Sequence, residues 1–200
     1  HIHCQQIGSQ LGVLFSSLSQ MQSGKDTLTS LLNRRYLPVV LKHEVTLAME
    51  YELPMTVAII DIDHFKEIND SWGHMVGDRA IKHVAELLSD NIRSSDYIFR
   101  YGGEEFCALL PGVSAAEALA VGERLRKRIQ NLRIPHQSSS VAPHLTASIG
   151  VALREAGSPM SNQELTEYAD KTLYRAQTSG RNQVCFYNPA ASSLPGETAL

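Results

Sequence analysis

The stretch Tyr97–Leu110, YIFRYGGEEFCALL, predicts two short β-strands joined by a tight turn. Its two ends are apolar and rich in residues that favour strands, and the glycine pair between them, Gly102 and Gly103, suits a hairpin turn. Two acids, Glu104 and Glu105, follow the glycines directly. The hairpin therefore carries two carboxylates at its tip, next to backbone that a ligand can approach closely.

A third acid is expected at the same edge of the sheet. Residues Thr56–Ile62, TVAIIDI, form a continuous apolar run typical of a buried central strand, and Asp61 lies near its end. In a ferredoxin-like sheet the first strand lies beside the central hairpin, so Asp61 would meet Glu104 and Glu105. Neighbouring carboxylates repel one another unless a cation lies between them. The sequence therefore predicts a site for a hard metal ion.

The rest of the chain predicts an α+β fold. Apolar periodicity and turn residues indicate helices over residues 26–51, 64–70, 77–92, 114–132 and 161–178, and strands over 56–62, 97–101, 106–110, 145–153 and 184–187. Ser114 with Glu117, and Ser161 with Glu164, have capping-box spacing. Gly180 suits the end of the last helix. The order β-α-α-β-β-α-β-α-β predicts a ferredoxin-like, nucleotidyl-cyclase-like central sheet that contains antiparallel strands and is surrounded by helices.

Composition narrows the classes of function. The chain has 200 residues, and its 18 basic and 21 acidic side chains give a net charge of −3, which argues against a nucleic-acid-binding surface. Three widely spaced cysteines suggest neither a disulfide framework nor a zinc site, so a cytoplasmic location is expected. No apolar run is long enough to cross a bilayer. Because the chain begins with His1, it reads as a fragment of a longer protein.

The N-terminal stretch predicts a signalling helix. Apolar residues recur with steps of four and three, an a/d heptad pattern, at Ile7, Leu11, Leu14, Leu18 and Met21, and Leu28 continues it. Such a helix could pair with its twin in a second copy and transmit a signal downstream. An amphipathic helix packed on its own domain is the alternative.

Several separated motifs resemble the GGDEF family of diguanylate cyclases. The hairpin carries an intact GGEEF form of the family's defining motif at residues 102–106. Further matching blocks, in order, are Asp26-Thr27-Leu28-Thr29, Asn33-Arg34-Arg35, Asp61-Ile62-Asp63-His64-Phe65-Lys66, Asn69-Asp70, Gly73-His74, Gly77-Asp78, Ala169-Asp170, Tyr174 and Gly180-Arg181-Asn182. The resemblance implies a linker or signalling helix over 1–25, a catalytic domain over 26–188 and a disordered tail over 189–200.

The resemblance also implies the chemistry. Two GTP molecules would be joined into cyclic di-GMP with release of two pyrophosphates, across the two-fold axis of a homodimer. Each half-site would hold two Mg²⁺ ions, with Mn²⁺ as an alternative, on Asp61, Glu104 and the Ile62 carbonyl, and Glu105 would assist catalysis. The implied substrate-binding residues are Phe65, Lys66, Asn69, His74, Asp78, Gly102, Gly103 and Arg181.

One position departs from the family's pattern. Between Tyr174 and Gly180 the family commonly has a lysine that pairs with the terminal phosphates, and Gln177 occupies that place here. The loss of a cation predicts weaker binding of the triphosphate, or a shift of its role to Arg175 or Arg181.

A second, regulatory site is implied by the sequence Arg93-Ser94-Ser95-Asp96. This RxxD pattern resembles the family's inhibitory site for the product, and Arg124 on the following helix matches a further arginine of that site. Arginine suits phosphate and guanine, and a carboxylate accepts from the guanine edge. The resemblance predicts feedback inhibition by cyclic di-GMP.

Other functions remain open from the sequence. A catalytically weak domain that serves as a receptor for cyclic di-GMP or GTP, a class III nucleotide cyclase and a purely structural dimerisation module are the alternatives. Within the family, residues 26–38 and 93–106 resemble the output domains of oxygen-sensing globin-coupled cyclases. That resemblance implies an upstream sensor domain in the full-length protein. The lack of a long apolar run predicts that this part does not insert into a membrane.

Overall fold

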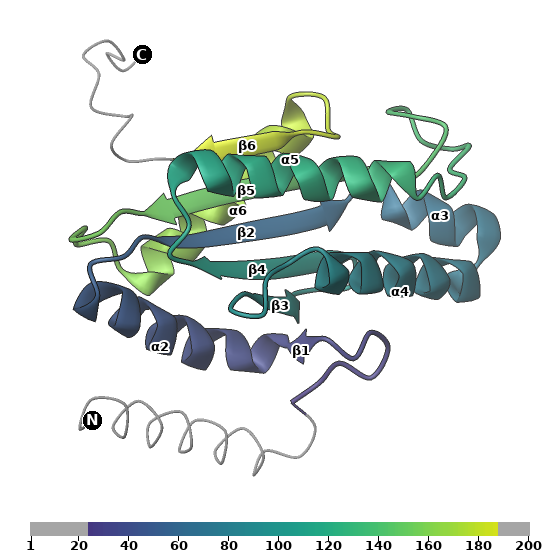
Figure 1. Ribbon diagram of the computed structural model, residues 1–200. Helices are drawn as coiled ribbons and strands as arrows, with labels where there is room; N and C mark the ends of the chain where they lie inside the picture. Colours follow the sequence, from purple (N-terminus) through teal and green to yellow (C-terminus); the bar gives the residue numbers. More distant parts are fainter. Residues whose placement is uncertain (1–23, 188–200) are drawn as a thin grey trace.

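The computed structural model describes residues 24–187, which form one mixed sheet with helices on both faces (Figure 1). The predicted heptad over residues 7–21 and the predicted disordered tail lie outside the described residues. The strands are β1 Leu32–Asn33, β2 Met55–Ile62, β3 Tyr97–Arg100, β4 Glu105–Pro111, β5 Ala147–Arg154 and β6 Val184–Tyr187. The helices are the 3₁₀ turn η1 Arg34–Tyr36, α2 Leu37–Glu50, α3 Phe65–Trp72, α4 His74–Asp90, α5 Ala115–Asn131 and α6 Asn162–Thr178.

The sheet confirms the predicted fold class. Its strand order is β1-β3-β4-β2-β5-β6. The four inner strands pair antiparallel in the arrangement of a ferredoxin-like sheet, with β2 between β4 and β5. The short strands β1 and β6 extend the two edges by parallel pairing. The register places Asp61 directly opposite Glu105, so the predicted meeting of β2 with the hairpin is confirmed.

Each face of the sheet carries its own hydrophobic core. Successive side chains of a strand point to opposite faces, and in β2 the residues Ala58 and Ile60 pack with α3, α4 and α5, whereas Val57 and Ile59 pack with α2 and α6. Figure 1 shows α4 and α5 on one side of the sheet and α6 on the other. Asp61 follows the odd-numbered residues of β2, so it belongs to the face covered by α6.

Capping residues begin two of the helices, α5 and α6, where the sequence predicted them. Ser114 caps α5 and Ser161 caps α6, and in both cases the glutamate three residues later completes a capping box. Gly180 follows the end of α6 with φ of 113°, a backbone conformation that suits glycine. Among the described residues, no helix has both the length and the apolar character that a membrane span needs.

The helix predicted over residues 26–51 is wrong in its first third. Asp26 accepts hydrogen bonds from the backbone of Leu28 and Thr29 and from the Thr29 hydroxyl, and these bonds hold a turn. The chain then pairs with β3 through β1, and α2 begins only at Leu37, with Pro38 in its first turn. Aspartate and threonine side chains that bind nearby backbone compete with helix formation, and here they prevail.

Candidate active site

Carboxylates crowd the edge of the sheet where β2 ends and β4 begins. Burial, followed by the charges of Glu105, Glu104 and Asp63, raises the pKa of Asp61 to about 7. The pKa of Glu105 is also raised, first by burial and then by Asp170 and Glu104, although Arg34 opposes this shift. Carboxylates that raise one another's pKa values in this way share a site without enough cations to balance them. The predicted convergence of Asp61, Glu104 and Glu105 is therefore supported by their electrostatic coupling.

The carboxylates at this edge suit a magnesium ion whose coordination is completed by phosphate oxygens of a substrate. Within residues 24–187, no three His, Cys, Asp or Glu side chains come together closely enough to enclose a metal by themselves. Mg²⁺ does not need such a cage, because it is usually held by one or two carboxylates together with phosphate oxygens and water. Asp61 lies near the end of β2 and Glu104 directly before β4, and the Ile62 N–H donates to the Glu104 carbonyl over 3.3 Å.

Asp63, two residues further on, is fully satisfied by the protein. It is 1% exposed, and its carboxylate accepts hydrogen bonds from the Thr146 hydroxyl at 2.8 Å, the Ser148 hydroxyl at 2.6 Å and the Asn182 N–H at 3.0 Å. These partners join β2, β5 and the turn after α6. Asp63 therefore fixes the turn that carries Arg181 against the end of β2.

The hairpin tip is held by Arg100. Its guanidinium donates to the carbonyls of Gly102 at 3.1 Å and Gly103 at 2.7 Å, and to the Asp26 carboxylate at 3.1 Å. The N-terminal turn and the glycine turn are thereby tied together by one partly buried cation. A Cβ at Gly102 would lie 2.4 Å from a Glu105 carboxylate oxygen, whereas Gly103 faces open space. Of these two glycines, only Gly102 is closely approached by another side chain, and a larger residue there would force the Glu105 carboxylate to move.

The predicted guanine contacts lie on α3 and α4, which follow β2. Asn69 and the exposed Asp78 lie on these two adjacent helices, and a Cβ at Gly77 would collide with the Asn69 amide oxygen. Gly77 therefore leaves the space that the Asn69 side chain occupies. Of the other predicted substrate residues, Phe65 is buried, and Lys66 and His74 are exposed.

The last turn of α6 and the turn that follows it carry two further residues discussed above, Gln177 and Arg181. Arg181 has φ of 61° and its backbone N–H donates to the Ala176 carbonyl, but its side chain forms no hydrogen bond or ion pair with the described residues. It is available for an anionic ligand. Gln177, on α6, hydrogen-bonds the Asp61 carboxylate and lowers its pKa against the larger effects that raise it.

The RxxD residues also come together. The Arg93 N–H donates to the Asp96 carboxylate at 2.8 Å, and both Arg93 and Arg124 lower the pKa of Asp96, whose burial raises it overall. Arg124 donates to the Asn91 carbonyl at 3.0 Å. Among the described residues, the second carboxylate oxygen of Asp96 is buried and has no hydrogen-bond partner. The charges of two arginines therefore act on one carboxylate, while the Arg93 guanidinium itself lies 3.9 Å from the Glu117 carboxylate.

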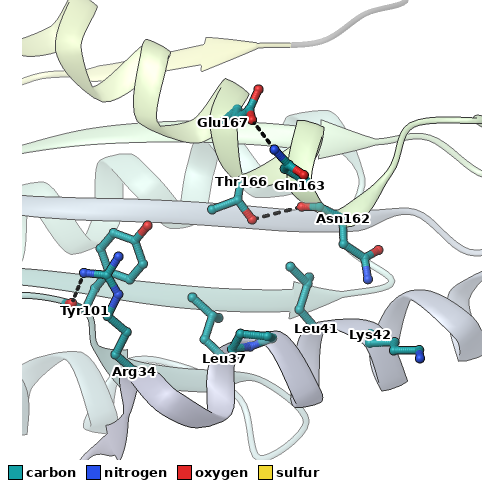
Figure 2. A pocket seen from close by; sticks show the side chains of 10 residues that line it. Arg34, Leu37, Leu41, Lys42, Tyr101, Asn162, Gln163, Thr166 and Glu167 are labelled. Carbon is teal, nitrogen blue, oxygen red and sulfur yellow. Dashed lines mark hydrogen bonds between the residues drawn. The ribbon is translucent and has the colours of Figure 1, made fainter.

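A separate groove of about 450 Å³ lies between α2 and α6. Figure 2 shows Leu37 and Leu41 of α2 facing Asn162, Gln163 and Thr166 of α6. At its end, Arg34 lies over the Tyr101 ring, 4.4 Å from the centroid, and contacts the Tyr101 carbonyl at 3.4 Å. The predicted catalytic acids do not line this groove, so it is distinct from the candidate active site.

Sequence reasoning missed the residues that hold the site together. Arg100, Asp63 and Asp170 had no assigned role. Arg100 and Asp63 act through hydrogen bonds with residues distant in the sequence, and Asp170 acts through its charge on Glu105. A signal did exist for Asp170 and Asp63, since both lie within the matching motif blocks. Arg100 lies directly before Tyr101 and could have been found only by asking what stabilises an exposed Gly-Gly turn.

The fold and this acidic edge define a nucleotidyl-cyclase-like domain, and sequence comparison specifies which one. Residues 23–183 match the family described as "Diguanylate cyclase, GGDEF domain". The chain belongs to this family.

Two curated relatives carry the same description as diguanylate cyclases, one of them as a probable one. The chain is 43% identical over 179 residues to diguanylate cyclase DosC of Escherichia coli K12, a match that covers 90% of this chain and 38% of the relative. It is 37% identical over 162 residues to the probable diguanylate cyclase DgcT of the same organism, covering 80% of this chain and 35% of the relative. The chain therefore spans little more than a third of the length of these relatives.

Among solved structures, the fold is similar to the GGDEF domain of DgcB from Caulobacter crescentus in complex with cyclic di-GMP, with a TM-score of 0.75 and 32% identity. That match covers 82% of this chain and 96% of the other. The active GGEEF domain of a diguanylate cyclase from Vibrio cholerae gives a TM-score of 0.69 and 30% identity, over 79% and 98% of the two chains.

Proposed function

We propose that this chain is a diguanylate cyclase that condenses two GTP molecules into cyclic di-GMP and two pyrophosphates. The observation that carries the proposal is the cluster of Asp61, Glu104 and Glu105 where β2 pairs with β4. Burial, and then the charges of Glu105 and Glu104, raise the pKa of Asp61 to about 7. A protein without a cationic ligand at this edge would gain nothing from such an arrangement.

The acidic residues have two proposed roles, metal binding and proton transfer. Asp61, Glu104 and the Ile62 carbonyl would hold magnesium, which would supply charge neutralisation for the phosphates. Glu105 has a raised pKa and accepts the proton of the ribose 3′-hydroxyl as that oxygen attacks the α-phosphorus of the other GTP. The bond from the α-phosphorus to the pyrophosphate oxygen breaks, and a second reaction of the same kind closes the ring.

The remaining residues bind and orient GTP. Asn69 and Asp78 hydrogen-bond the guanine edge, which distinguishes it from adenine because a mismatched base leaves these polar groups unpaired. Lys66 and Arg181 contact the phosphates through donors and positive charge. The further proposed contacts come from the backbone of Phe65, from Gly102 and Gly103, and from His74.

The reaction requires a second copy of the domain. Each domain binds one GTP, so two must face each other across a two-fold axis for the 3′-hydroxyl of one to reach the other. We infer a homodimer whose alignment is set by the segment before residue 26 and by an upstream sensor. The resemblance to the output domains of globin-coupled oxygen sensors supports such an upstream sensor. GTP as substrate and the free thiols of Cys107 and Cys185 support a cytoplasmic location.

The RxxD cluster is proposed to bind the product and inhibit the enzyme. The unpartnered oxygen of Asp96 can accept from the guanine N–H groups, and Arg93 and Arg124 provide donors for phosphate. Arg93→Ala should raise the concentration of cyclic di-GMP that gives half-maximal inhibition by about tenfold or more, the loss of one charge-assisted contact. Unchanged inhibition would contradict this assignment.

The decisive experiment is an incubation of the dimeric protein with GTP and Mg²⁺, followed by chromatography of the products. Cyclic di-GMP and pyrophosphate support the proposal. Cyclic GMP would instead indicate a class III cyclase. Gln177 favours one alternative, a catalytically weak receptor, because it places a neutral amide on Asp61 where the family commonly has a cation. Tight binding of GTP or cyclic di-GMP without turnover would support that receptor function.

A further inference from the structure

The loop between α5 and β5 packs against α3, the helix with the proposed nucleotide contacts. Its two legs bond to each other: the His136 N–H donates to the Pro143 carbonyl at 3.0 Å, and the Leu145 N–H donates to the Ile134 carbonyl at 2.8 Å. We call residues 134–145 the α5–β5 loop. These bonds give the loop a defined shape from which its side chains reach α3.

His136 in this loop bonds to the turn that starts α3. Its ring is 1% exposed, and its Nε2 lies 3.0 Å from the backbone carbonyl oxygen of His64. Because a carbonyl oxygen only accepts, Nε2 must carry the hydrogen. The same carbonyl also accepts the Glu67 N–H at 3.1 Å.

The turn at His64 needs such support. His64 has φ of 56° and ψ of 33°, the left-handed conformation, which is unfavourable by about 1–2 kcal/mol for a residue other than glycine. This conformation redirects the chain from β2 into α3. A buried donor on its carbonyl favours the strained turn over alternatives that would release the hydrogen bond.

Two further contacts attach the loop to α3. The Ser140 hydroxyl lies 3.2 Å from Nε2 of His64, whose Nδ1 lies 3.1 Å from the Glu67 carboxylate. A carboxylate accepts, so Nδ1 donates, and in the neutral ring Nε2 accepts from Ser140. At the other end of α3, the hydroxyls of Ser138 and Ser71 lie 2.9 Å apart. The loop thus contacts both the beginning and the end of the helix.

We propose that His136 is a positioning residue for nucleotide binding: by bonding the His64 carbonyl, it fixes the β2–α3 turn and holds Lys66 and Asn69 where the nucleotide requires them. The inference rests on the proposed function for its kinetic consequence. Its structural consequence, the stability of α3, does not depend on that function.

The kinetic test compares three variants with the wild type. His136→Leu removes the donor and should raise the KM for GTP about tenfold while kcat changes less, because misplaced binding groups weaken the substrate complex. His136→Gln places an amide N–H near the position of Nε2 and should return the KM to within about threefold of the wild-type value. His144→Leu is the matched control, since it removes a histidine from the other leg of the same loop, and its KM should not change.

A second readout separates this inference from the proposed function. Hydrogen exchange of residues 65–72 should be faster in His136→Leu than in the wild type and normal in His136→Gln, without a general increase across the sheet. A wild type that makes no cyclic di-GMP would defeat the proposed function, yet this local exchange would still support the role of His136. A folded His136→Leu protein with unchanged KM and unchanged exchange in α3 would overturn it.

Should His136→Leu fail to fold, the loop can be tested from its other contacts. The double variant Ser138→Ala, Ser140→Ala removes the two hydroxyl contacts and leaves the buried imidazole in place. Its α3 amides should exchange faster and its KM should rise about threefold, as expected for the loss of exposed hydrogen bonds. Wild-type values for both measurements would overturn the inference.

Discussion

Asp61 and Asp63 lie two residues apart at the same end of β2, but their surroundings are opposite. Asp63 is enclosed by three donors from β5 and from the turn after α6. Asp61 faces Glu105 across the strand pair, is coupled electrostatically to Glu104, and accepts from the Gln177 side chain. One carboxylate is therefore satisfied by the protein, and the other is raised in pKa to about 7.

The difference distinguishes a structural acid from the proposed metal-binding acid. A buried carboxylate that accepts several hydrogen bonds stabilises the fold, because each donor would otherwise lose its partner. A carboxylate buried beside other carboxylates opposes the fold until a cation arrives. The residue type is the same at both positions, and Asp63 is the more deeply buried of the two, so the neighbours and not burial decide the role.

Of the variants proposed, the one that removes the charge of Asp61 should have the largest effect on activity. It should not destabilise the fold. Asp61→Asn is expected to lower cyclic di-GMP synthesis by about 10²–10³-fold or more, the usual loss when a main electrostatic contact to the reacting groups is removed. Without metal, its melting temperature should equal or exceed that of the wild type, because repulsion with Glu105 is relieved. Asp90→Asn, at an exposed acid of α4, is the control. Near-normal turnover by Asp61→Asn would remove the proposed metal site.

Asp63 should show the reverse pattern. Asp63→Ala leaves the two hydroxyls and the Asn182 N–H without their acceptor, and we expect a loss of roughly 3 kcal/mol in the free energy of unfolding. Urea denaturation of the metal-free protein measures it directly. Asp63→Asn, which keeps one acceptor, should lose less. If Asp63→Ala were as stable as Asp61→Asn, the contrast between the two positions would be wrong.

The pH dependence of stability should follow from the raised pKa of Asp61. In the unfolded chain this group ionises near its ordinary value of 3.8, whereas in the folded protein it holds its proton up to about pH 7. The folded state therefore binds more protons between these values, and the penalty from ionised Asp61, complete above pH 7, disappears as the pH falls toward 4. In EDTA, the melting temperature of the wild type should approach that of Asp61→Asn over this range. A constant difference between the two would contradict the shift.

Gln177 should give the smallest effect. Gln177→Lys introduces a cation beside Asp61, and we expect the KM for GTP to fall about threefold, within the range of a partly exposed ion pair. Gln177→Met removes the hydrogen bond to Asp61 without adding charge and should not lower the KM. A higher KM in the lysine variant would show that the amide, and not a cation, suits this site best.

Much of the fold could be predicted because its signals are local. The apolar run of β2 and the glycine pair of the hairpin were sufficient to place the central strands, and the serine–glutamate pairs located the starts of α5 and α6. The prediction failed between Asp26 and Tyr36, where helical periodicity competed with the pairing of β1 to β3 and with the Arg100–Asp26 contact. Neither interaction is visible within a window of neighbouring residues.

The sequence by itself determined the family, the strand order around Asp61 and the acids that meet there, since motif spacing and strand alternation act over short distances. Only the tertiary structure decided which aspartate is satisfied, that Arg100 holds the glycine turn and that His136 bonds to His64 across 72 residues. Buried polar groups must find partners wherever the folded chain supplies them, and those partners come from distant segments.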